Sequence, residues 1–315
     1  MLTVRLDDGA VSLRDRPRPR RPEGFALIRL LYGGICNTDL ELQRGYYGFR
    51  GIPGHEFVGE VVAADTPAWI GRRVVGEINL ACGECDWCAR DLGRHCPRRT
   101  VLGIVKHPGA FREYLTLPER NLHRVPSEIR SEHAVFIEPL AAACEILDQV
   151  RMPKGAPVAV LGDGKLGLLI GQVLKAHGAE VHQYGHHREK LRIAANAGIE
   201  TRLAKKLPAA QYGWVVDSTG SSEGLRQAVR MATPRGTVVM KSTVHGLVGI
   251  DSAPVIVNEI TLVGSRCGRF EPAIKLLKNG RVRVDSLISE VLPLKNAPLA
   301  FRRAATRGVL KVLMK

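Results

Sequence analysis

The sequence lacks any long run of apolar residues. None of its apolar stretches approaches the ~20 residues that a membrane-spanning helix requires, so we expect no membrane partner. The first 24 residues contain no apolar signal core, and we expect no secretory leader. The seven cysteines have spacings typical of metal ligands rather than of a disulfide framework. Together these absences predict a protein of the reducing cytoplasm.

The sequence also lacks a nucleic-acid-binding module. Its net charge is +15 at pH 7, but it contains no helix-turn-helix, RNA-recognition motif or platform of aromatic and basic side chains that we can identify. Arginines are spread along the whole chain, apart from a cluster from Arg14 to Arg21. We interpret the charge as a basic solvated surface that would also favour an anionic cofactor, and we expect no nucleic-acid partner.

The length and composition predict two domains. With 315 residues, of which 45% are hydrophobic, the chain can form two buried cores. Short apolar runs separated by turns in residues 1–126 predict a small barrel-like β domain. From residue 156 onward, strand patterns alternate with helix patterns, which predicts a doubly wound parallel sheet. Residues from about 269 onward are too few for another domain, and we expect them to return to the first.

Residues 33–60 bring a thiol, an imidazole and a carboxylate into one glycine-rich stretch. Cys36, His55 and Glu56 are residue types that bind zinc, and a catalytic zinc site leaves one position open for water or substrate. The spacing alone is equally compatible with a core thiol beside a loop histidine. Glu138 lies in a separate apolar run, where a carboxylate needs a cation, a metal or the amides of a helix start.

Four further cysteines form a second candidate metal site. They follow the pattern C-x2-C-x2-C-x7-C in a segment with few apolar residues: Cys82, Cys85, Cys88 and Cys96. Four thiolates can close a tetrahedral shell around one zinc, with no position left for water. We predict a structural zinc that stabilises residues 82–96, a segment too polar to fold alone. An iron–sulfur cluster is the alternative.

A glycine-rich turn follows the strand expected at residues 158–161. The motif G-x-G-x-x-G between a strand and a helix is typical of a dinucleotide-binding βαβ unit. Gly162 would permit the tight turn, Gly164 the approach of the pyrophosphate, and Gly167 close helix packing. Lys165 and Leu166 lie within the motif and are candidate cofactor contacts.

The second strand of this unit favours NADP over NAD. It ends at Gly185, without the carboxylate that binds the ribose of NAD, and a basic cluster follows: His186, His187 and Arg188. This cluster could bind the 2′-phosphate, or it could be a solvated basic turn. Later strand ends are expected to face the nicotinamide half, and their candidate contacts are Ser218, Thr219, Gly220, Ser242, Thr243, Ser265 and Arg266.

The sequence resembles the zinc-dependent medium-chain dehydrogenase/reductase family. The resemblance is carried by five segments in this order: GGICNTDLE, GHEFVGEVV, the four-cysteine segment, IEPLAAA and GDGKLG. That family includes alcohol, sorbitol, threonine and glucose dehydrogenases, and the resemblance covers essentially the whole chain. It implies a GroES-like catalytic domain (residues 1–139 and 267–315) with an inserted Rossmann domain (residues 140–266). It also implies a homodimer or homotetramer that pairs through the strand at 259–263.

The resemblance assigns roles to single residues. Cys36, His55 and Glu56 match catalytic zinc ligands, and Glu138 matches a further, movable ligand. Thr38 matches the hydroxyl that passes on the substrate's proton.

Three neighbouring positions complete this comparison. Asp39 matches a carboxylate that holds a zinc ligand in place. Asn37 replaces a usual glycine, and Glu41 occupies the place of the relay histidine of liver-type alcohol dehydrogenases. Glu41 is therefore a candidate for the proton route.

The sequence thus predicts a zinc-dependent, NADP(H)-preferring alcohol, polyol or sugar dehydrogenase with two zinc ions per chain. The alternatives are an NAD-dependent polyol or threonine-type dehydrogenase and a non-catalytic NADP-binding sensor or scaffold. A zinc-independent enone or quinone reductase is disfavoured, because such relatives lack both sets of zinc ligands.

Overall fold

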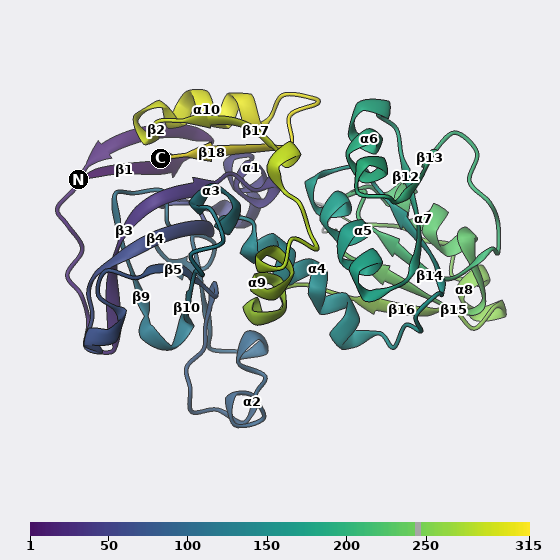
Figure 1. The fold of residues 1–315 in the computed structure, drawn as a ribbon, viewed down its shortest axis with the longest axis horizontal. Helices are drawn as coiled ribbons and strands as arrows, with labels where there is room; N and C mark the ends of the chain where they lie inside the picture. The colour runs from purple at the N-terminus through teal and green to yellow at the C-terminus, as the bar shows by residue number, and fades with distance from the viewer. Residues whose placement is uncertain (243–246) are drawn as a thin grey trace. The chain divides into compact units, whose positions relative to one another are not determined.

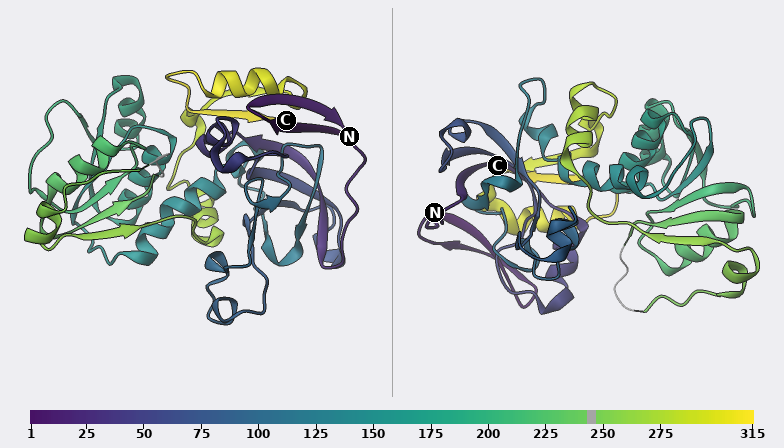
Figure 2. Two further views of the ribbon diagram at one scale, coloured as in Figure 1. Left: turned by 180° about the vertical axis from the view of Figure 1, so that it is seen from behind. Right: turned by 90° about the horizontal axis from the view of Figure 1, so that it is seen from below.

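The computed structural model describes residues 1–242 and 247–315. These residues form two compact units, Met1–Glu138 with Leu287–Lys315, and Pro139–Ser286 (Figures 1 and 2). The sequence-based boundaries assigned residues 267–286 to the first unit, whereas their contacts group them with the second. The side chain of Gln172 explains part of this difference, because it donates to the carbonyl of Arg283 at 3.1 Å and accepts from its N–H at 2.8 Å.

The first unit is built mainly on antiparallel strands. Its seven-stranded sheet has the order β10-β5-β4-β3-β18-β17, with β9 also paired to β3, and smaller sheets are formed by β1-β2 and β6-β7-β8. The strands are β1 (Leu2–Asp7), β2 (Ala10–Asp15), β3 (Phe25–Gly34), β4 (Glu56–Ala63), β5 (Arg73–Gly76), β6 (Asn79–Leu80), β7 (Thr100–Leu102), β8 (Lys106–His107), β9 (Tyr114–Pro118), β10 (Leu122–Arg124), β17 (Ile288–Leu292) and β18 (Lys311–Met314). This arrangement confirms the predicted β domain.

Short helices complete the first unit: α1 (Asn37–Gln43), α2 (Asp86–Ala89), α3 (Ser131–Ala134) and α10 (Ala297–Ala304). One of its core clusters joins β1, α1, α10 and β18, and Phe111 meets Phe301 edge to face with ring centroids 6.1 Å apart. The segment that carries α2 projects from the rest of this unit (Figures 1 and 2). Because few apolar residues anchor it, this segment needs another source of stability.

The second unit contains a six-stranded, fully parallel sheet of order β13-β12-β11-β14-β15-β16. Its elements are α4 (Ile137–Gln149), β11 (Pro157–Leu161), α5 (Lys165–His177), β12 (Glu180–Gly185), α6 (Arg188–Asn196), β13 (Glu200–Leu203), β14 (Tyr212–Asp217), α7 (Ser222–Met231), β15 (Ala232–Met240), α8 (Ala253–Val257), β16 (Thr261–Gly264) and α9 (Phe270–Lys278). Leu161 pairs with both Tyr184 and Asp217, so the strands β11, β12 and β14 end at the same edge. The predicted doubly wound sheet is confirmed.

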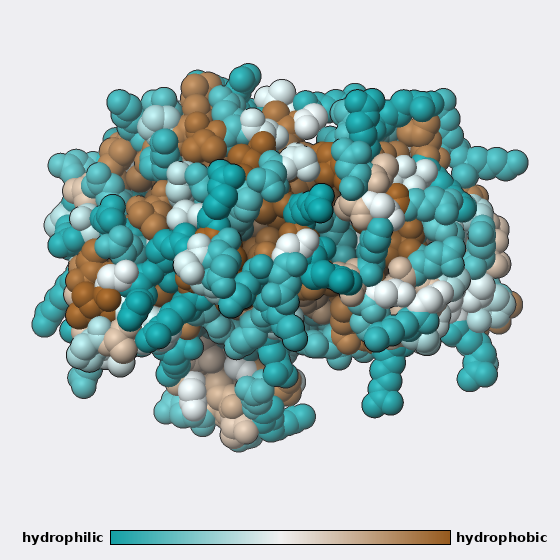
Figure 3. Space-filling view, viewed as in Figure 1, coloured by the Kyte–Doolittle hydropathy of each residue, from teal (hydrophilic) through white to brown (hydrophobic). Residues whose placement is uncertain are grey.

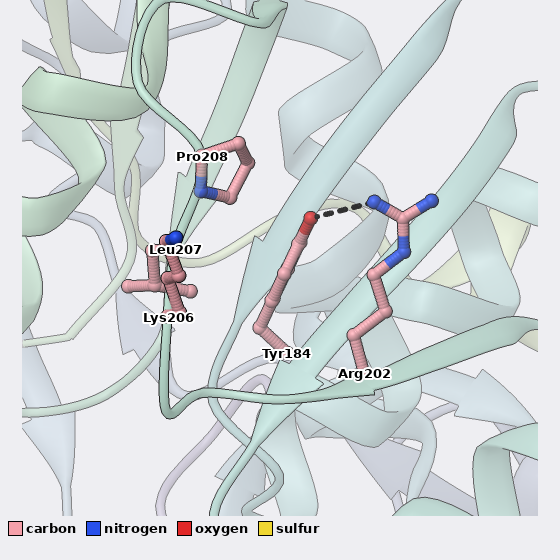
Figure 4. A pocket seen from close by; sticks show the side chains of 5 residues that line it. All are labelled: Tyr184, Arg202, Lys206, Leu207 and Pro208. Atoms are coloured by element: carbon pink, nitrogen blue, oxygen red, sulfur yellow. Dashed lines mark hydrogen bonds between the residues drawn. The ribbon is translucent and has the colours of Figure 1, made fainter.

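Residues 204–211 connect β13 to β14 without forming a helix. Ala204 and Leu207 of this connection pack on the same apolar cluster as Leu225 of α7 and Val255 of α8. A cavity of about 270 Å³ lies beside the connection, lined by Tyr184, Arg202, Lys206, Leu207 and Pro208 (Figure 4). A loop therefore covers this part of the sheet face incompletely.

Beneath that connection, five side chains from three strands form a closed ring of polar contacts. His182 Nδ1 lies 2.8 Å from the hydroxyl of Tyr212, which lies 2.7 Å from the hydroxyl of Tyr184. Arg202 donates to Tyr184 at 3.2 Å, as Figure 4 shows, and to Glu200 at 2.7 Å. Glu200 closes the ring 3.2 Å from His182 Nε2. We call this group the polar ring.

Among the described residues, no helix has both the length and the apolar character needed to cross a membrane. On the face shown in Figure 3, hydrophilic side chains cover most of both units.

Candidate metal and cofactor sites

The first candidate site forms where β3 ends and β4 begins. These strands are antiparallel, and Gly34 pairs with Glu56, so the residues that follow β3 meet those that start β4. Cys36, His55 and Glu56 each offer a ligand atom, and these atoms lie within 4.8 Å of one another. The alternative of a core thiol beside an unrelated loop histidine does not describe this arrangement.

Asp39, at the start of α1, connects the residues around this site. Its carboxylate accepts hydrogen bonds from the backbone N–H of Cys36 at 2.8 Å and of Gly54 at 3.1 Å. Its Oδ1 also lies 3.5 Å from Nδ1 of His55, which is an ion-pair distance rather than a hydrogen bond. Burial of His55 lowers its pKa, but Asp39 and Cys36 outweigh burial and hold the pKa well above its ordinary value.

The donor atoms fit a zinc ion. The set combines a sulfur, an imidazole nitrogen and a carboxylate oxygen, which is chemistry that zinc accepts. Glu56 is 1% exposed, and its Oε1 has no hydrogen-bond partner among the described residues. A bound cation would satisfy that buried oxygen.

Other residues that the sequence singled out surround this group. The Thr38 hydroxyl lies 3.8 Å from Cys36 Sγ. The Glu41 carboxylate pairs with Arg44, which follows the last residue of α1, and Asn37 is exposed. Glu138 lies in the first turn of α4 and is not one of the three clustered residues, so its role as a movable ligand stays a prediction.

The second candidate site has the geometry of four ligands around one ion. Sulfur atoms of its members lie between 3.5 and 3.9 Å apart in four pairs: Cys82–Cys88, Cys85–Cys88, Cys85–Cys96 and Cys96–Cys82. Tetrahedral coordination with Zn–S bonds of ~2.3 Å would separate the sulfurs by roughly 3.8 Å. The backbone N–H of Glu84 lowers the pKa of Cys82 to about 6, whereas burial raises the pKa of Cys88 to about 11, so metal binding would have to displace protons from this group.

The glycine turn of the second unit has the geometry of a pyrophosphate-binding loop. Gly162 has φ of +117°, and a Cβ there would lie 2.7 Å from Ser218 Oγ. A Cβ on Gly167 would lie 2.3 Å from the carbonyl oxygen of Gly162, so helix α5 approaches the turn only without one. Around Gly164 a Cβ would meet no protein atom within 4 Å, which leaves space for a ligand at the start of α5.

The expectation that no carboxylate lies at the end of β12 is wrong. Asp163, inside the glycine motif, reaches across to this strand end and accepts from the N–H groups of His186 and His187, both at 2.7 Å. Its Oδ2 also lies 3.1 Å from Nδ1 of His187. A Cβ on Gly185 would lie 2.5 Å from this carboxylate, so Asp163 occupies the space of a strand-end side chain.

The remaining strand ends carry polar groups that are largely satisfied within the protein. Ser218 donates to the carbonyl of Leu161 at 2.7 Å, and Thr219 donates to Asp217 at 2.7 Å. Of the other predicted contacts, Gly220 and Ser242 follow β14 and β15, and Thr243 lies outside the described residues.

Sequence reasoning missed Lys241, which is buried at the end of β15. Its ammonium donates to Ser265 Oγ at 2.9 Å and to the carbonyl of Arg266 at 2.6 Å. A lysine directly after an apolar strand was the only signal in the sequence.

Two family models match the chain. The first, described as an alcohol dehydrogenase GroES-like domain, covers residues 22–127, and the second, described as a zinc-binding dehydrogenase, covers residues 166–279. Each model matches part of one of the two units, and the first includes both predicted ligand sets. The chain belongs to the zinc-containing medium-chain dehydrogenase/reductase family. This dehydrogenase therefore has a structural zinc site of four cysteines, a catalytic Cys/His/Glu site and an NAD(P) cofactor.

Relatives of this dehydrogenase match over nearly their full length. A sorbitol dehydrogenase of Halalkalibacterium halodurans is 27% identical, over 97% of this chain and 96% of that protein. A D-arabitol-phosphate dehydrogenase of Enterococcus avium is 29% identical, over 94% and 91%. A structure of a zinc-binding dehydrogenase from Sinorhizobium meliloti 1021, bound to NADP, is 28% identical with a TM-score of 0.91, over 99% and 98%.

Proposed function

We propose that this dehydrogenase oxidises a hydroxyl of a polyol or sugar, or reduces the matching carbonyl, with NADP(H) as its preferred cofactor. The observation that carries the proposal is the cluster of Cys36, His55 and Glu56, whose ligand atoms lie within 4.8 Å of one another in one unit. The polyol class is supported by the sorbitol and D-arabitol-phosphate dehydrogenases among its relatives.

The chain's own residues have distinct parts in this proposal. Cys36, His55 and Glu56 would hold the catalytic zinc, with Glu138 as a movable further ligand. When bound, zinc supplies Lewis-acid polarisation of the substrate oxygen, and the nicotinamide accepts or returns the hydride.

Thr38 would move the proton. Its hydroxyl is near enough to Cys36 Sγ, at 3.8 Å, to lie beside a substrate oxygen at the open coordination position. From Thr38 Oγ1 the proton would pass toward solvent. Glu41 on the same helix is the candidate next acceptor, although its pairing with Arg44 must loosen for this role.

The NADP preference is supported by the positive charge at the end of β12. His186, His187 and Arg188 follow this strand, and α6 begins at Arg188, where the helix dipole favours an anion. The Asp163 carboxylate would repel a 2′-phosphate if it were free, but it is engaged by two backbone N–H groups and faces the ring of His187. Similar structures contain either cofactor, NADP in one and NADH in another, so this support comes from the residues after β12.

A panel of polyols, sugars and simple alcohols, each assayed with NADP+ and NAD+, tests the substrate class and the cofactor preference together. The proposal expects the highest kcat/KM for a polyol or sugar with NADP+. A simple alcohol as the best substrate would contradict the polyol class. A higher kcat/KM with NAD+ would contradict the cofactor preference and leave the zinc chemistry standing.

Cys36→Ser tests the catalytic site itself. We expect turnover to fall at least 1,000-fold, roughly 4 kcal/mol of barrier, while NADP binding is retained. Cys144→Ala, at a buried cysteine outside both ligand sets, is the matched control. Unchanged turnover in Cys36→Ser with its catalytic zinc missing would refute the assignment and favour a sensor or scaffold.

We further propose that the enzyme is a homo-oligomer paired through β16. This strand is last in the sheet order, so one edge of it has no neighbouring strand among the described residues. The preceding helix α8 exposes two apolar side chains, Ile256 at 72% and Val257 at 79%. Light scattering of Ile256→Glu/Val257→Lys should give a smaller species than the parent, and an unchanged mass would exclude this edge.

A further inference from the structure

A buried lysine from β18 contacts the candidate catalytic site. Lys311 is 1% exposed, and its ammonium donates to Glu56 Oε2 and lies 3.5 Å from the carbonyl oxygen of Ile35. It also lies 5.8 Å from the ring centroid of Phe136. Because an unpaired buried ammonium is costly, the contact with Glu56 is a requirement of burying Lys311.

This contact divides the two oxygens of Glu56. Oε2 is taken by Lys311, whereas Oε1 is buried and without a hydrogen-bond partner among the described residues. Only Oε1 is therefore free to meet a cation beside Cys36 and His55. The lysine thus sets which oxygen of Glu56 is available.

The fold makes room for this pair at Gly34. A Cβ on Gly34 would lie 2.8 Å from Glu56 Oε2 and 3.4 Å from Lys311 Cδ. Gly34 pairs with Glu56 across β3–β4 and with Leu313 across β3–β18, so it lies between the two charged residues. A side chain at position 34 would push the pair apart.

The net charge of the site explains why a lysine is needed at this contact. With Cys36 as a thiolate, this partly buried side chain and the buried carboxylates of Asp39 and Glu56 bring three negative charges together, and a divalent cation leaves one of them uncompensated. The ammonium of Lys311 supplies the missing positive charge.

We propose that Lys311 is a positioning residue of the catalytic metal site. It neutralises the residual charge and holds Glu56 by one oxygen, so that a single oxygen faces the metal. This inference rests on the proposed Cys36–His55–Glu56 site.

The test compares Lys311→Met, which removes the charge at similar length, with Lys311→Arg, which keeps it. Zinc is removed from the catalytic site with a chelator, metal analysis confirms which zinc remains, and zinc affinity is then measured by chelator competition. We expect Lys311→Met to bind catalytic zinc at least tenfold more tightly than the parent, because the metal-free site carries an unpaired buried carboxylate that zinc relieves. Lys311→Arg should stay within about threefold of the parent.

Cobalt substitution gives a second readout that does not depend on turnover. With both Glu56 oxygens free in Lys311→Met, the visible cobalt bands should shift and weaken as the coordination number rises. A merely structural lysine would lower Tm equally with and without zinc and leave zinc affinity and the cobalt spectrum unchanged. Either unchanged readout would overturn the proposal.

A second variant covers the case in which Lys311→Met does not fold. Lys311→Met/Glu56→Gln removes both charges, and we expect it to fold and to melt above the single variant without metal. If neither folds, charge balance is not what Lys311 provides, and the proposal is overturned. If metal analysis of the parent enzyme finds zinc only at the four-cysteine site, the proposed function itself is refuted. This result distinguishes failure of the proposed function from failure of the role proposed for Lys311.

Discussion

The carboxylate of Asp163 lies against His187: it accepts a hydrogen bond from the His187 backbone N–H at 2.7 Å and lies 3.1 Å from its Nδ1. Asp163 is part of the glycine turn, and His187 precedes helix α6, so this contact joins the two loops at the end of the first βαβ unit. It places a carboxylate where the strand itself supplies none.

Replacing Asp163 tests whether this contact serves NADP binding. Asp163→Ala should weaken NADPH binding at least tenfold, because the turn that carries His186, His187 and Arg188 loses charge-assisted hydrogen bonds of ~1.5–3 kcal/mol each. Asp163→Asn keeps an acceptor and should lose less. Fluorescence titration with NADPH and NADH measures both variants, with the exposed Asp148→Ala as control. Tighter NADPH binding in Asp163→Ala would mean that the carboxylate acts by repulsion.

The four-cysteine site should stabilise only its own segment. Cys85→Ser removes one of four ligands, so zinc per chain should fall from two to one while the catalytic zinc and cofactor binding persist. Metal analysis and limited proteolysis within residues 82–96 measure the two effects. A brown protein that contains iron, or loss of both metals, would contradict the assignment of a separate structural zinc.

The polar ring should behave as one unit in unfolding. Tyr212→Phe removes the hydroxyl that joins His182 to Tyr184, and we expect a loss of ~1–3 kcal/mol because buried partners are left unsatisfied. Tyr32→Phe, which removes a single partly buried hydrogen bond to Glu132, is the matched control and should cost less. Equal losses in denaturant unfolding would show that the ring adds nothing beyond separate bonds.

Asp217 predicts a pH dependence of stability. Burial raises the pKa of this carboxyl above its ordinary value, although the hydroxyl and N–H of Thr219 oppose the effect. Between the unfolded pKa of ~3.9 and the raised folded pKa, the folded state binds more protons, so Asp217 costs stability as pH rises through this window. Asp217→Asn lacks this cost and keeps an acceptor for Thr219. The Tm of Asp217→Asn minus the Tm of the parent should increase as pH rises from roughly 4. A difference in Tm that stays constant with pH would contradict the raised pKa.

The sequence predicted features that depend on local spacing. The four-cysteine pattern lies within 15 residues and the glycine motif within six. Short apolar runs separated by turns predicted the first β domain, and alternating strand and helix patterns predicted the parallel sheet. The cluster of Cys36 with His55 and Glu56 was also within reach, because one antiparallel pairing of β3 and β4 brings them together.

Contacts between distant segments were not predictable in this way. Lys311 meets Glu56 across 255 residues, and an apolar strand that contains one lysine gives no indication of its partner. The partners of Asp163 were not predictable from the sequence either, because the direction of its side chain depends on how two loops meet. The absence of an acid in β12 therefore led to the wrong expectation that no carboxylate lies at the end of this strand. The polar ring required the register of three strands, which the sequence alone does not specify.

Gly34 and Glu56 come from consecutive strands, whereas Lys311 lies 255 residues after Glu56, and the absence of a side chain at Gly34 leaves room for the contact between the other two. A chimera that joins residues 1–286 of this enzyme to the last strands of a family member would keep the glycine and the glutamate but take the residue opposite them from the other parent. Recombination between relatives should therefore succeed only when all three positions come from the same parent.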